Sequence, residues 1–510
     1  MNKMQLFFIF WLAGLAACTP IPENVTRVKE CAPIYPDYTD ITIPYNIAPM
    51  NFMIEGAEGL QVTAYGDTDS LRISGKDKAR FPIGKWKKLL LQQKGKSVQV
   101  RVTALMKGKW LEYPSFQWQV AAEAIDGYLS YRLIEPGYEV WNNLQLCERS
   151  LEDFSEKVIA DNKLTGGNCM NCHTYGKQSG RLSMFHLRGK NGGTILNRDG
   201  KLRKLSLKND SMISAAVYGD FHPSGRYAVF SSNIIIPAFH AQGSKRLEVY
   251  DTESDLAIAD FEQNRMILSP LTRDKKVLET FPTFSADGKH IYYCSAPQTT
   301  LPDSICQLRY SLCRIGFDQE NGSWGKQADT LWNAREQQGS VCFPKASPDG
   351  KYLLFTIADY GTFPIWHRET DLYILNLSTE TIHECSVANS DRSDTYHSWS
   401  SNSHWFVFAS KRGDGQYGKP YFAYIDKEGK IYKPFVLPQQ DPAHYFHTFK
   451  SYNIPELSKS PLPFDAVDIK EIYLNSPAEP FNNRFIFTVV VPKLTWRDSL
   501  FLFKDAVEIG

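Results

Sequence analysis

Short apolar strands, each introduced by a similar turn, recur along the middle of the chain. In most copies the turn holds Ser or Asp, then Gly, then Lys or Arg, and an apolar and aromatic run follows. The four clear copies lie at residues 221–230, 284–293, 346–355 and 399–408. A turn of this composition before a hydrophobic run predicts a β-hairpin, and its recurrence predicts a repeat architecture.

Further strands with alternating hydrophobic and polar positions follow several copies, at residues 247–251, 371–375 and 421–425. A weaker fifth copy lies at residues 179–185, with later strands at 193–197 and 201–207. Several short antiparallel strands per repeat favour the blades of a β-propeller. We therefore predict an all-β protein with a propeller over residues 126–460. Six is the expected number of blades, from five readable copies and one composite.

The flanking regions have different patterns. Residues 45–125 contain alternating segments with some intervening Gly and Asp turns, which predict a small β-sandwich-like domain ahead of the propeller. Residues 151–162 have apolar and acidic positions at helical spacing, which predicts a helix. Residues 461–510, including 485–491, contain apolar runs that predict strands closing the propeller or packing on it, together with residues 128–151.

The first residues have the composition of an export signal. A short basic start precedes an apolar run at residues 6–15, and Leu15, Ala16, Ala17 and Cys18 resemble a bacterial lipobox. Residues 1–18 are therefore predicted to be a lipoprotein signal peptide with its lipobox, Cys18 the lipidated N-terminus, and residues 19–44 a tether. A plain transmembrane anchor is the alternative, although the run is short for a bilayer. The expected location is the envelope of a Gram-negative bacterium, on the periplasmic or outer-membrane face.

Composition limits the partners. The chain has 510 residues and a formal net charge of +1, which favours two or three domains and argues against nucleic acid as a partner. No phosphate-binding loop or dinucleotide fingerprint is present, so no nucleotide is expected. The expected partners are a membrane, through the lipid anchor, and proteins of the cell envelope.

The sequence Cys169-Met170-Asn171-Cys172-His173 carries the most specific chemistry. Two thiols three residues apart, followed at once by histidine, are the arrangement that attaches and ligates a c-type haem. The expected cofactor is covalent haem c, bonded to Cys169 and Cys172 with His173 as the axial ligand of the iron. A disulfide or free dithiol and a metal half-site are the alternatives. Polar flanks at 166–177 predict an accessible loop.

The second axial position decides whether such a group transfers electrons or binds small ligands. The main distal candidates are His222, His397 and Met184, with His186 and His240 as weaker ones. His222 and His397 belong to the repeats at positions expected near the central channel. A core methionine and hydrogen-bonded structural histidines are the alternatives for all of these residues.

The repeat signature, exemplified by residues 347–351, resembles that of TolB-like propellers. Together with the haem motif and residues 131–139, 186–190 and 396–400, it is most similar to the TolB-like lipoproteins with one CxxCH motif that are described as cytochrome c biosynthesis proteins. The resemblance spans about residues 124–457 and implies a WD-repeat-like propeller body. It does not imply an activity, because this fold carries many functions.

These observations predict an exported, membrane-anchored propeller with one covalent haem, acting as an electron-transfer or redox-associated module rather than as an independent enzyme. One alternative is a haem-free TolB-like interaction scaffold. Another is a glycan hydrolase, because Glu279 and Asp394 occupy similar places before their repeat signatures and are candidates for an acid and base pair.

Overall fold

The computed structural model describes residues 24–135, 143–239 and 247–482. The described chain forms two compact units. The first comprises residues 24–125, 151–155 and 432–449, and the second comprises the remaining described residues. The lipobox with Cys18, the candidate His240 and the predicted strands at 485–491 lie outside the described residues.

The first unit contains a mixed seven-stranded sheet, a three-stranded sheet and one helix of ten residues. The large sheet is β1 (Val25–Arg27), β9 (Lys109–Glu112), β8 (Ser97–Met106), β10 (Phe116–Ala121) and β3 (Ile41–Pro44), with β5 (Gly59–Tyr65) on β8 and β6 (Ser70–Gly75) on β5. The small sheet is β2 (Ile34–Tyr35), β4 (Phe52–Ile54) and β7 (Lys78–Ala79), and the unit also holds α1 (Ile83–Gln92), β33 (Phe435–Val436) and α3 (His444–His447).

One expectation for this unit was wrong. The described part of the expected tether, residues 24–44, contributes three strands, because Ile41 and Ile43 are buried and β3 pairs in parallel with β10. Where a small β-sandwich-like domain was expected, the unit has two sheets together with helix α1, which buries Trp86, Leu89 and Leu90. Burial alternates along β5 and β8 as the sequence predicted.

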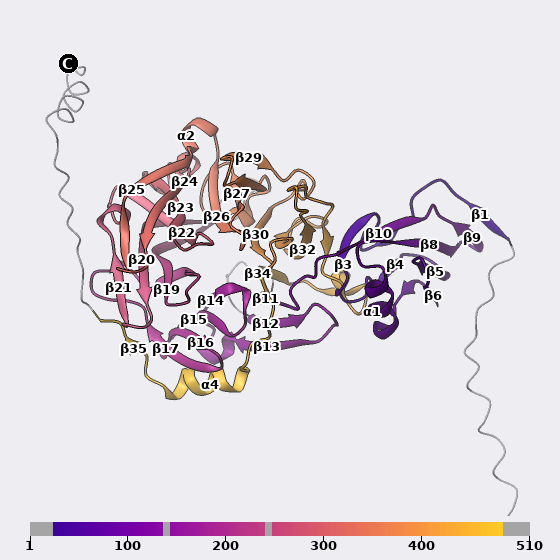
Figure 1. The fold of residues 1–510 in the computed structure, drawn as a ribbon, viewed down its shortest axis with the longest axis horizontal. Coiled ribbons are helices and arrows are strands. Elements are labelled where there is room, and N and C mark those ends of the chain that lie inside the picture. The colour runs from indigo at the N-terminus through magenta and orange to yellow at the C-terminus, as the bar shows by residue number, and fades with distance from the viewer. Residues whose placement is uncertain (1–23, 136–142, 240–246, 483–510) are drawn as a thin grey trace, which may run out of the picture. The chain divides into compact units, whose positions relative to one another are not determined.

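The second unit is a β-propeller, as predicted (Figure 1). Its described residues form six sheets. From the inner edge outward, the first two sheets are β34 (Ser451–Ser458), β11 (Tyr128–Ile134), β12 (Leu144–Ser150) and β13 (Glu156–Asp161), and β14 (Met170–Tyr175), β15 (Leu182–Leu187), β16 (Gly193–Arg198), β17 (Lys201–Ser206) and β35 (Glu479–Pro480). The next two are β18 (Ala216–Phe221), β19 (Tyr227–Phe239), β20 (Leu247–Asp260) and β21 (Arg265–Leu268), and β22 (Val277–Phe284), β23 (His290–Pro297), β24 (Ser311–Asp318) and β25 (Ser323–Trp332). The last two are β26 (Ser340–Ala346), β27 (Tyr352–Ala358), β28 (Asp371–Asn376) and β29 (Thr381–Glu384), and β30 (Asp394–Trp399), β31 (Trp405–Ser410) and β32 (Lys419–Tyr424).

The inner strands close a ring. Consecutive inner strands contact one another in the order β14, β18, β22, β26, β30 and β34, and β34 contacts β14 again. One sheet is built from both ends of the unit, because β34 pairs with β11 across more than 300 residues of sequence. Each of the six sheets therefore has a neighbour on both sides, against which the described strands pack their hydrophobic side chains.

The composite sheet differs in part from the expected one. Its strands β11 and β12 lie within the predicted segment 128–151, but its inner strand β34 precedes residue 461. The described residues after 460 form helix α4 (Ala466–Asn475) and β35, which pairs with β17. The helix expected at 151–162 is instead β13, because this segment pairs with β12 and buries Ile159 and Ala160 in the hydrophobic core.

The repeat turns have the chemistry that the sequence indicated. Gly225, Gly288 and Gly350 have φ of 76°, 74° and 73°, a left-handed conformation that glycine adopts without steric cost. Within one such turn the Ser285 hydroxyl donates to Asp287 at 2.6 Å and accepts from the His290 amide at 3.0 Å. The signature therefore encodes a turn stabilised by its own side chains.

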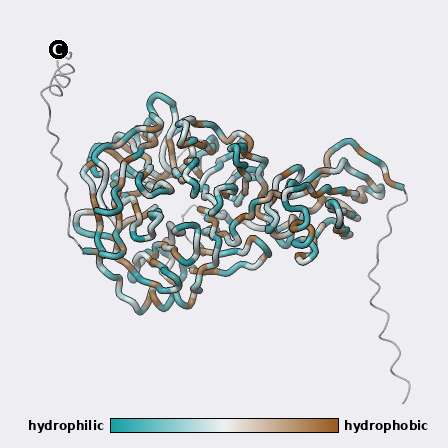
Figure 2. Tube along the Cα trace, in the orientation of Figure 1, coloured by the Kyte–Doolittle hydropathy of each residue, from teal (hydrophilic) through white to brown (hydrophobic). Residues whose placement is uncertain are grey.

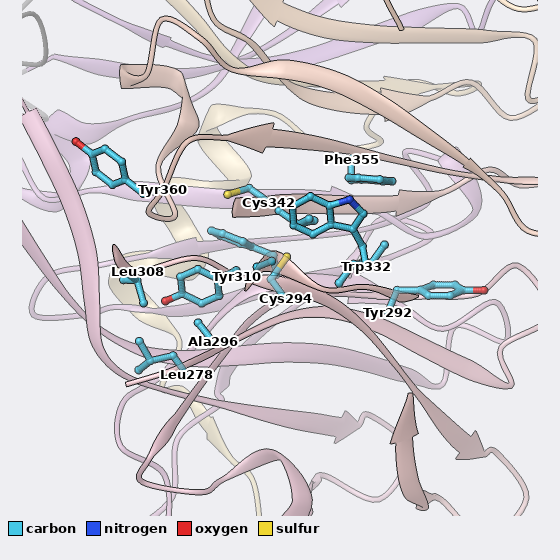
Figure 3. Packing of buried hydrophobic residues seen from close by; sticks show 14 of the residues in the cluster. Leu278, Tyr292, Cys294, Ala296, Leu308, Tyr310, Trp332, Cys342, Phe355 and Tyr360 are labelled. Carbon is cyan, nitrogen blue, oxygen red and sulfur yellow. The ribbon is translucent and has the colours of Figure 1, made fainter. Parts of the chain in front are cut away.

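Hydrophobic residues fill the spaces between neighbouring sheets. Along the chain, hydrophobic positions alternate with hydrophilic ones (Figure 2), so that each strand presents one set of side chains to a core. One such core contains Leu278, Tyr310, Trp332 and Phe355 from β22 to β27 and the segments between them (Figure 3). None of the described helices is long and apolar enough to cross a membrane.

Replacing Leu457 with alanine is expected to lower the free energy of unfolding of the propeller by about 2–5 kcal/mol, because this side chain is fully buried on β34, the strand that closes the ring. Urea denaturation followed by circular dichroism measures the change. Leu474→Ala is the matched control, since Leu474 lies on α4 and is 49% exposed; its expected effect is within about 0.5 kcal/mol. Equal losses at both positions would contradict the closure role.

Candidate functional site in the central channel

The CxxCH motif lies in the wall of the central channel. Residues 170–175 form β14, an inner strand, and not the loop that the polar flanks predicted. Cys169, directly before this strand, is only 5% exposed, and His173 is 7% exposed. The reason is pairing: Thr174 and Tyr175 are in register with Met184 and Ser183 of β15, which draws the motif into the ring. The side chain of Cys172 lies outside the described part of the chain.

A β-bulge interrupts each inner strand at an equivalent place. The pairing register shifts between Asn171 and Thr174 in β14, as it does between Val217 and Asp220 in β18. The residues in left-handed conformation at these bulges are Tyr218, Phe281, Phe343, Tyr396 and Ile454, each with φ near 50°. Cys172 and His173 therefore occupy the bulge of β14, which places this part of the motif in the same ring of positions.

Four of the bulge residues form a continuous aromatic belt, defined as Tyr218, Phe281, Phe343 and Tyr396. Successive ring centroids along the belt are 4.8, 4.0 and 4.8 Å apart. Together with Ile454 the belt lines a channel cavity of about 70 Å³. Aromatic pairs at these distances stabilise one another beyond the area they bury, so the belt narrows this level of the channel.

His173 and His397 line this same cavity. Burial lowers the pKa of each imidazole to about 3, with a further contribution from the charge of Arg132 at His173 and of Lys345 at His397. Both rings are therefore neutral near pH 7. Nε2 of His173 is buried without a hydrogen-bond partner among the described residues.

The tautomer of His397 follows from its partner. Its Nε2 lies 2.8 Å from the carbonyl oxygen of Leu354 and must donate to it, because a carbonyl only accepts. Nδ1 of the neutral ring then carries the lone pair, and it has no partner in the described structure. Two neutral imidazoles thus line the cavity, His173 from β14 and His397 from β30, and each has one ring nitrogen without a hydrogen-bond partner among the described residues.

The structure does not bring the other distal candidates to this cavity. His222 lies in a repeat turn, where Nδ1 is 2.8 Å from the Ser224 hydroxyl and Nε2 is 3.2 Å from the Gly288 carbonyl oxygen. Met184 is buried in a hydrophobic core between sheets. His186 lies on β15 with Nδ1 2.7 Å from the Thr194 hydroxyl. The two histidines are hydrogen-bonded to neighbouring residues and Met184 is packed in a core, so none of the three lines the cavity of His173.

The two candidate catalytic carboxylates lie outside the two channel cavities. Neither Glu279 nor Asp394 lines either channel cavity. Asp394 is fully buried and pairs with Arg412 at 2.9 Å. Burial raises the pKa of Glu279 to about 8, with smaller contributions from two nearby aspartates. The described cavities therefore give no support to an acid and base pair at these positions, and that alternative stays a prediction.

A second ring of positions, two residues beyond each bulge apex, is polar. This polar belt consists of Thr174, Asp220, Thr283, Lys345, Ser398 and Glu456. Glu456 accepts from the Thr174 hydroxyl at 3.1 Å and from the Tyr175 amide at 3.0 Å, and burial raises its pKa to about 7. Lys345, Ser398 and Glu456 also line a larger cavity of about 240 Å³. The channel thus has a narrow aromatic level and a wider polar level.

The two belts were not predicted from the sequence, because the repeats are recognised by their turn signature and the belt residues precede that turn. A usable signal was present: aromatic-Pro or aromatic-His pairs stand shortly before three of the turns, at 281–282, 343–344 and 396–397. Cys172 and His173 stand in the same relation to the turn at residues 179–181.

The donor atoms of the motif suit a covalent haem. His173 offers an unpartnered ring nitrogen in the neutral form that binds iron, and Cys169 is a free thiol. The space is less suited, because 70 Å³ is well below the roughly 300–1,000 Å³ of cofactor pockets. The channel must widen around an attached group. Among the described residues no cluster of three or more His, Cys, Asp or Glu side chains is arranged to hold a metal ion.

Comparisons with known proteins add no functional assignment. No protein-family model matches the chain, and no curated protein matches it. Solved structures with a similar fold include the tricorn protease (12% identity, TM-score 0.35, covering 76% of this chain and 36% of that chain). They also include the β-propeller domain of the Trilobed protease from Pyrococcus furiosus (10%, 0.34, 79% and 98%) and a hypothetical selenium-binding protein from Sulfolobus tokodaii (9%, 0.39, 80% and 95%). The chain spans about a third of the tricorn protease.

The buried histidines predict an acid-sensitive fold. Their pKa values are below the unfolded value of about 6.5, so the unfolded chain binds protons between pH 6.5 and 3 that the folded chain does not. The free energy of unfolding should therefore fall as pH drops through this window. At pH 4.5 His397 accounts for about 2–3 kcal/mol of the loss.

Urea denaturation of haem-free protein at pH 7.5 and 4.5 tests this. The His397→Gln variant should lose less stability than the wild type between these pH values, because its side chain does not titrate. His383→Gln, at an exposed position on β29, should retain the wild-type pH dependence. Identical pH dependence in all three proteins would show that His397 is not a buried neutral group.

Proposed function

We propose that this protein is an exported, lipid-anchored propeller of the TolB-like type that carries one covalent haem c at the wall of its channel and serves as an electron-transfer or redox-associated module. The observation that carries the proposal is the unpartnered, buried Nε2 of His173 within a complete CxxCH motif. A buried polar atom without a partner is costly, and ligation of iron would satisfy it.

The residues have separate roles in this proposal. Cys169 and Cys172 form the two thioether bonds, which fix the position of the group on β14. His173 is the proximal ligand, held by the pairing of β14 with β15. His397 is the distal candidate that shares the cavity with His173. A bound haem would supply reversible one-electron transfer.

Cys18 is the proposed site of lipidation, which places the propeller at the surface of an envelope membrane. A c-type haem is attached outside the cytoplasm, so the export signal and the CxxCH motif support one another. The electron-transfer partners are then expected to be other proteins of the envelope.

Covalent haem should be present when the full chain is produced in a host with haem-attachment machinery. Haem-stained electrophoresis and intact-mass measurement should show one haem per chain in the wild type. Cys169→Ala and Cys172→Ala should each lose it, because each removes a thioether. Cys147→Ala is the matched control: it removes a buried thiol of β12 in the same unit and should keep the haem. Wild-type protein without haem would reject the proposal.

The visible spectrum tests the distal position. With His173 and His397 both ligating the iron, the wild type should show a six-coordinate, low-spin spectrum, and His397→Ala should convert it to a high-spin or ligand-accessible form. His222→Ala, in a repeat turn, should leave the spectrum unchanged. A low-spin spectrum that persists in the His397 variant would remove this residue from the proposed site.

One observation favours a second function. The aromatic belt leaves only about 70 Å³ where the haem would enter. A haem-free interaction scaffold needs no more space than this, and it is the function that a negative haem stain would support.

A further inference from the structure

The wider cavity at the mouth of the channel has the composition of an anion site. It measures about 240 Å³ and is lined by residues from all six inner strands or the turns that follow them. Three lysines line it, Lys177, Lys345 and Lys459, against two carboxylates, Asp220 and Glu456. None of its lining residues is an arginine.

Both carboxylates accept hydrogen bonds from neighbouring residues of the channel. Asp220 accepts from the Thr283 hydroxyl and the Phe284 amide, both at 2.9 Å, and lies 3.4 Å from the Lys345 ammonium group. Glu456 accepts from Thr174 and Tyr175 of β14. Lys177 and Lys459 form no ion pair within the described part of the chain. Asp126, which accepts hydrogen bonds from the cavity-lining Ser401, interacts electrostatically with Lys459, so Lys177 is the less compensated of the two ammonium groups.

The backbone beside these lysines is held in a strained conformation. Lys177 and Gln178 have φ of 55° and 47° and are two consecutive non-glycine residues in the left-handed region. The conformation is held by a clasp: the Lys459 amide donates to the Gln178 carbonyl oxygen at 2.9 Å, and the Ser179 and Ser460 hydroxyls lie 3.0 Å apart. Backbone strain of this kind persists where the surroundings enforce it, and it is frequent at ligand clamps.

The clasp joins the first and last inner strands of the ring. Lys177 and Gln178 follow β14, and Lys459 follows β34 directly. The side chains of Lys177, Gln178 and Lys459 thus reach the cavity from both sides of the closure, on segments that are hydrogen-bonded to each other. A ligand that binds all three would bridge the two ends of the propeller.

We propose that Lys177, Gln178 and Lys459 bind a small phosphate-bearing anion at the channel mouth, and that its binding stabilises the closed ring. Lysines act as point charges that approach a tetrahedral phosphate from different directions, whereas a planar carboxylate is bound best by the fork of arginine. A ligand that binds only the closed form raises its stability. The site uses none of the proposed haem ligands, so it does not rest on the presence of haem.

Titration calorimetry of the full chain with inorganic phosphate at low ionic strength tests the site. The wild type should bind one phosphate, with affinity that weakens as salt increases. Lys177→Gln and Lys459→Gln should each weaken binding about tenfold, a loss typical of one charge-assisted contact. Phosphate should also raise the melting temperature of the wild type, and this rise should disappear in the double variant.

Lys289→Gln is the matched control, because it makes the same charge change in an exposed repeat turn that does not line the cavity. It should bind phosphate as the wild type does. The proposal is overturned if phosphate does not bind at millimolar concentration, if Lys289→Gln weakens binding as much as Lys177→Gln, or if citrate binds more tightly than phosphate. The haem stain and this titration are independent, so each proposal fails on its own measurement.

Discussion

The pairing of β34 with β11 is the constraint on which the propeller depends. A row of twisted sheets has two unsatisfied faces, one at each end, and this pairing brings the two ends into a single sheet. The remaining interactions reinforce it: Glu456 of β34 accepts hydrogen bonds from β14, and the clasp between Gln178 and Lys459 lies just beyond. Ring closure thus determines which residues can meet in the channel.

The bulges of the inner strands turn this closed ring into a site. An unbulged strand would present alternate residues to the channel, whereas the extra residue at each bulge brings two neighbouring positions into its wall. Around the ring, the aromatic belt lies at the bulge apices and the polar belt lies two residues further along each inner strand. Cys172 and His173 of the CxxCH motif occupy the bulge of β14, so the imidazole of His173 lines the same cavity as the aromatic belt and His397.

Burial governs the electrostatics of both levels. In the narrow level it keeps His173 and His397 uncharged, which is the state in which an imidazole nitrogen can bind a metal. In the wider level hydroxyls, amides and Lys345 contact the carboxylates, while Lys177 and Lys459 form no ion pair with any described residue. The same channel therefore combines a cavity suited to a neutral donor set with one suited to an anion, and Lys345, Ser398 and Glu456 line both.

The sequence by itself determined the propeller class, because turn composition and strand alternation are local properties that survive in any context. It also identified the CxxCH motif, whose spacing is a property of five consecutive residues. Ring closure, the helix at α4, the strand at β13 and the channel position of the motif were decided by tertiary pairing, since each depends on partners distant in sequence. The positions of His397, His222 and Met184 were decided in the same way: all three lie in repeats, and only the three-dimensional register shows that His397 lines the same cavity as His173.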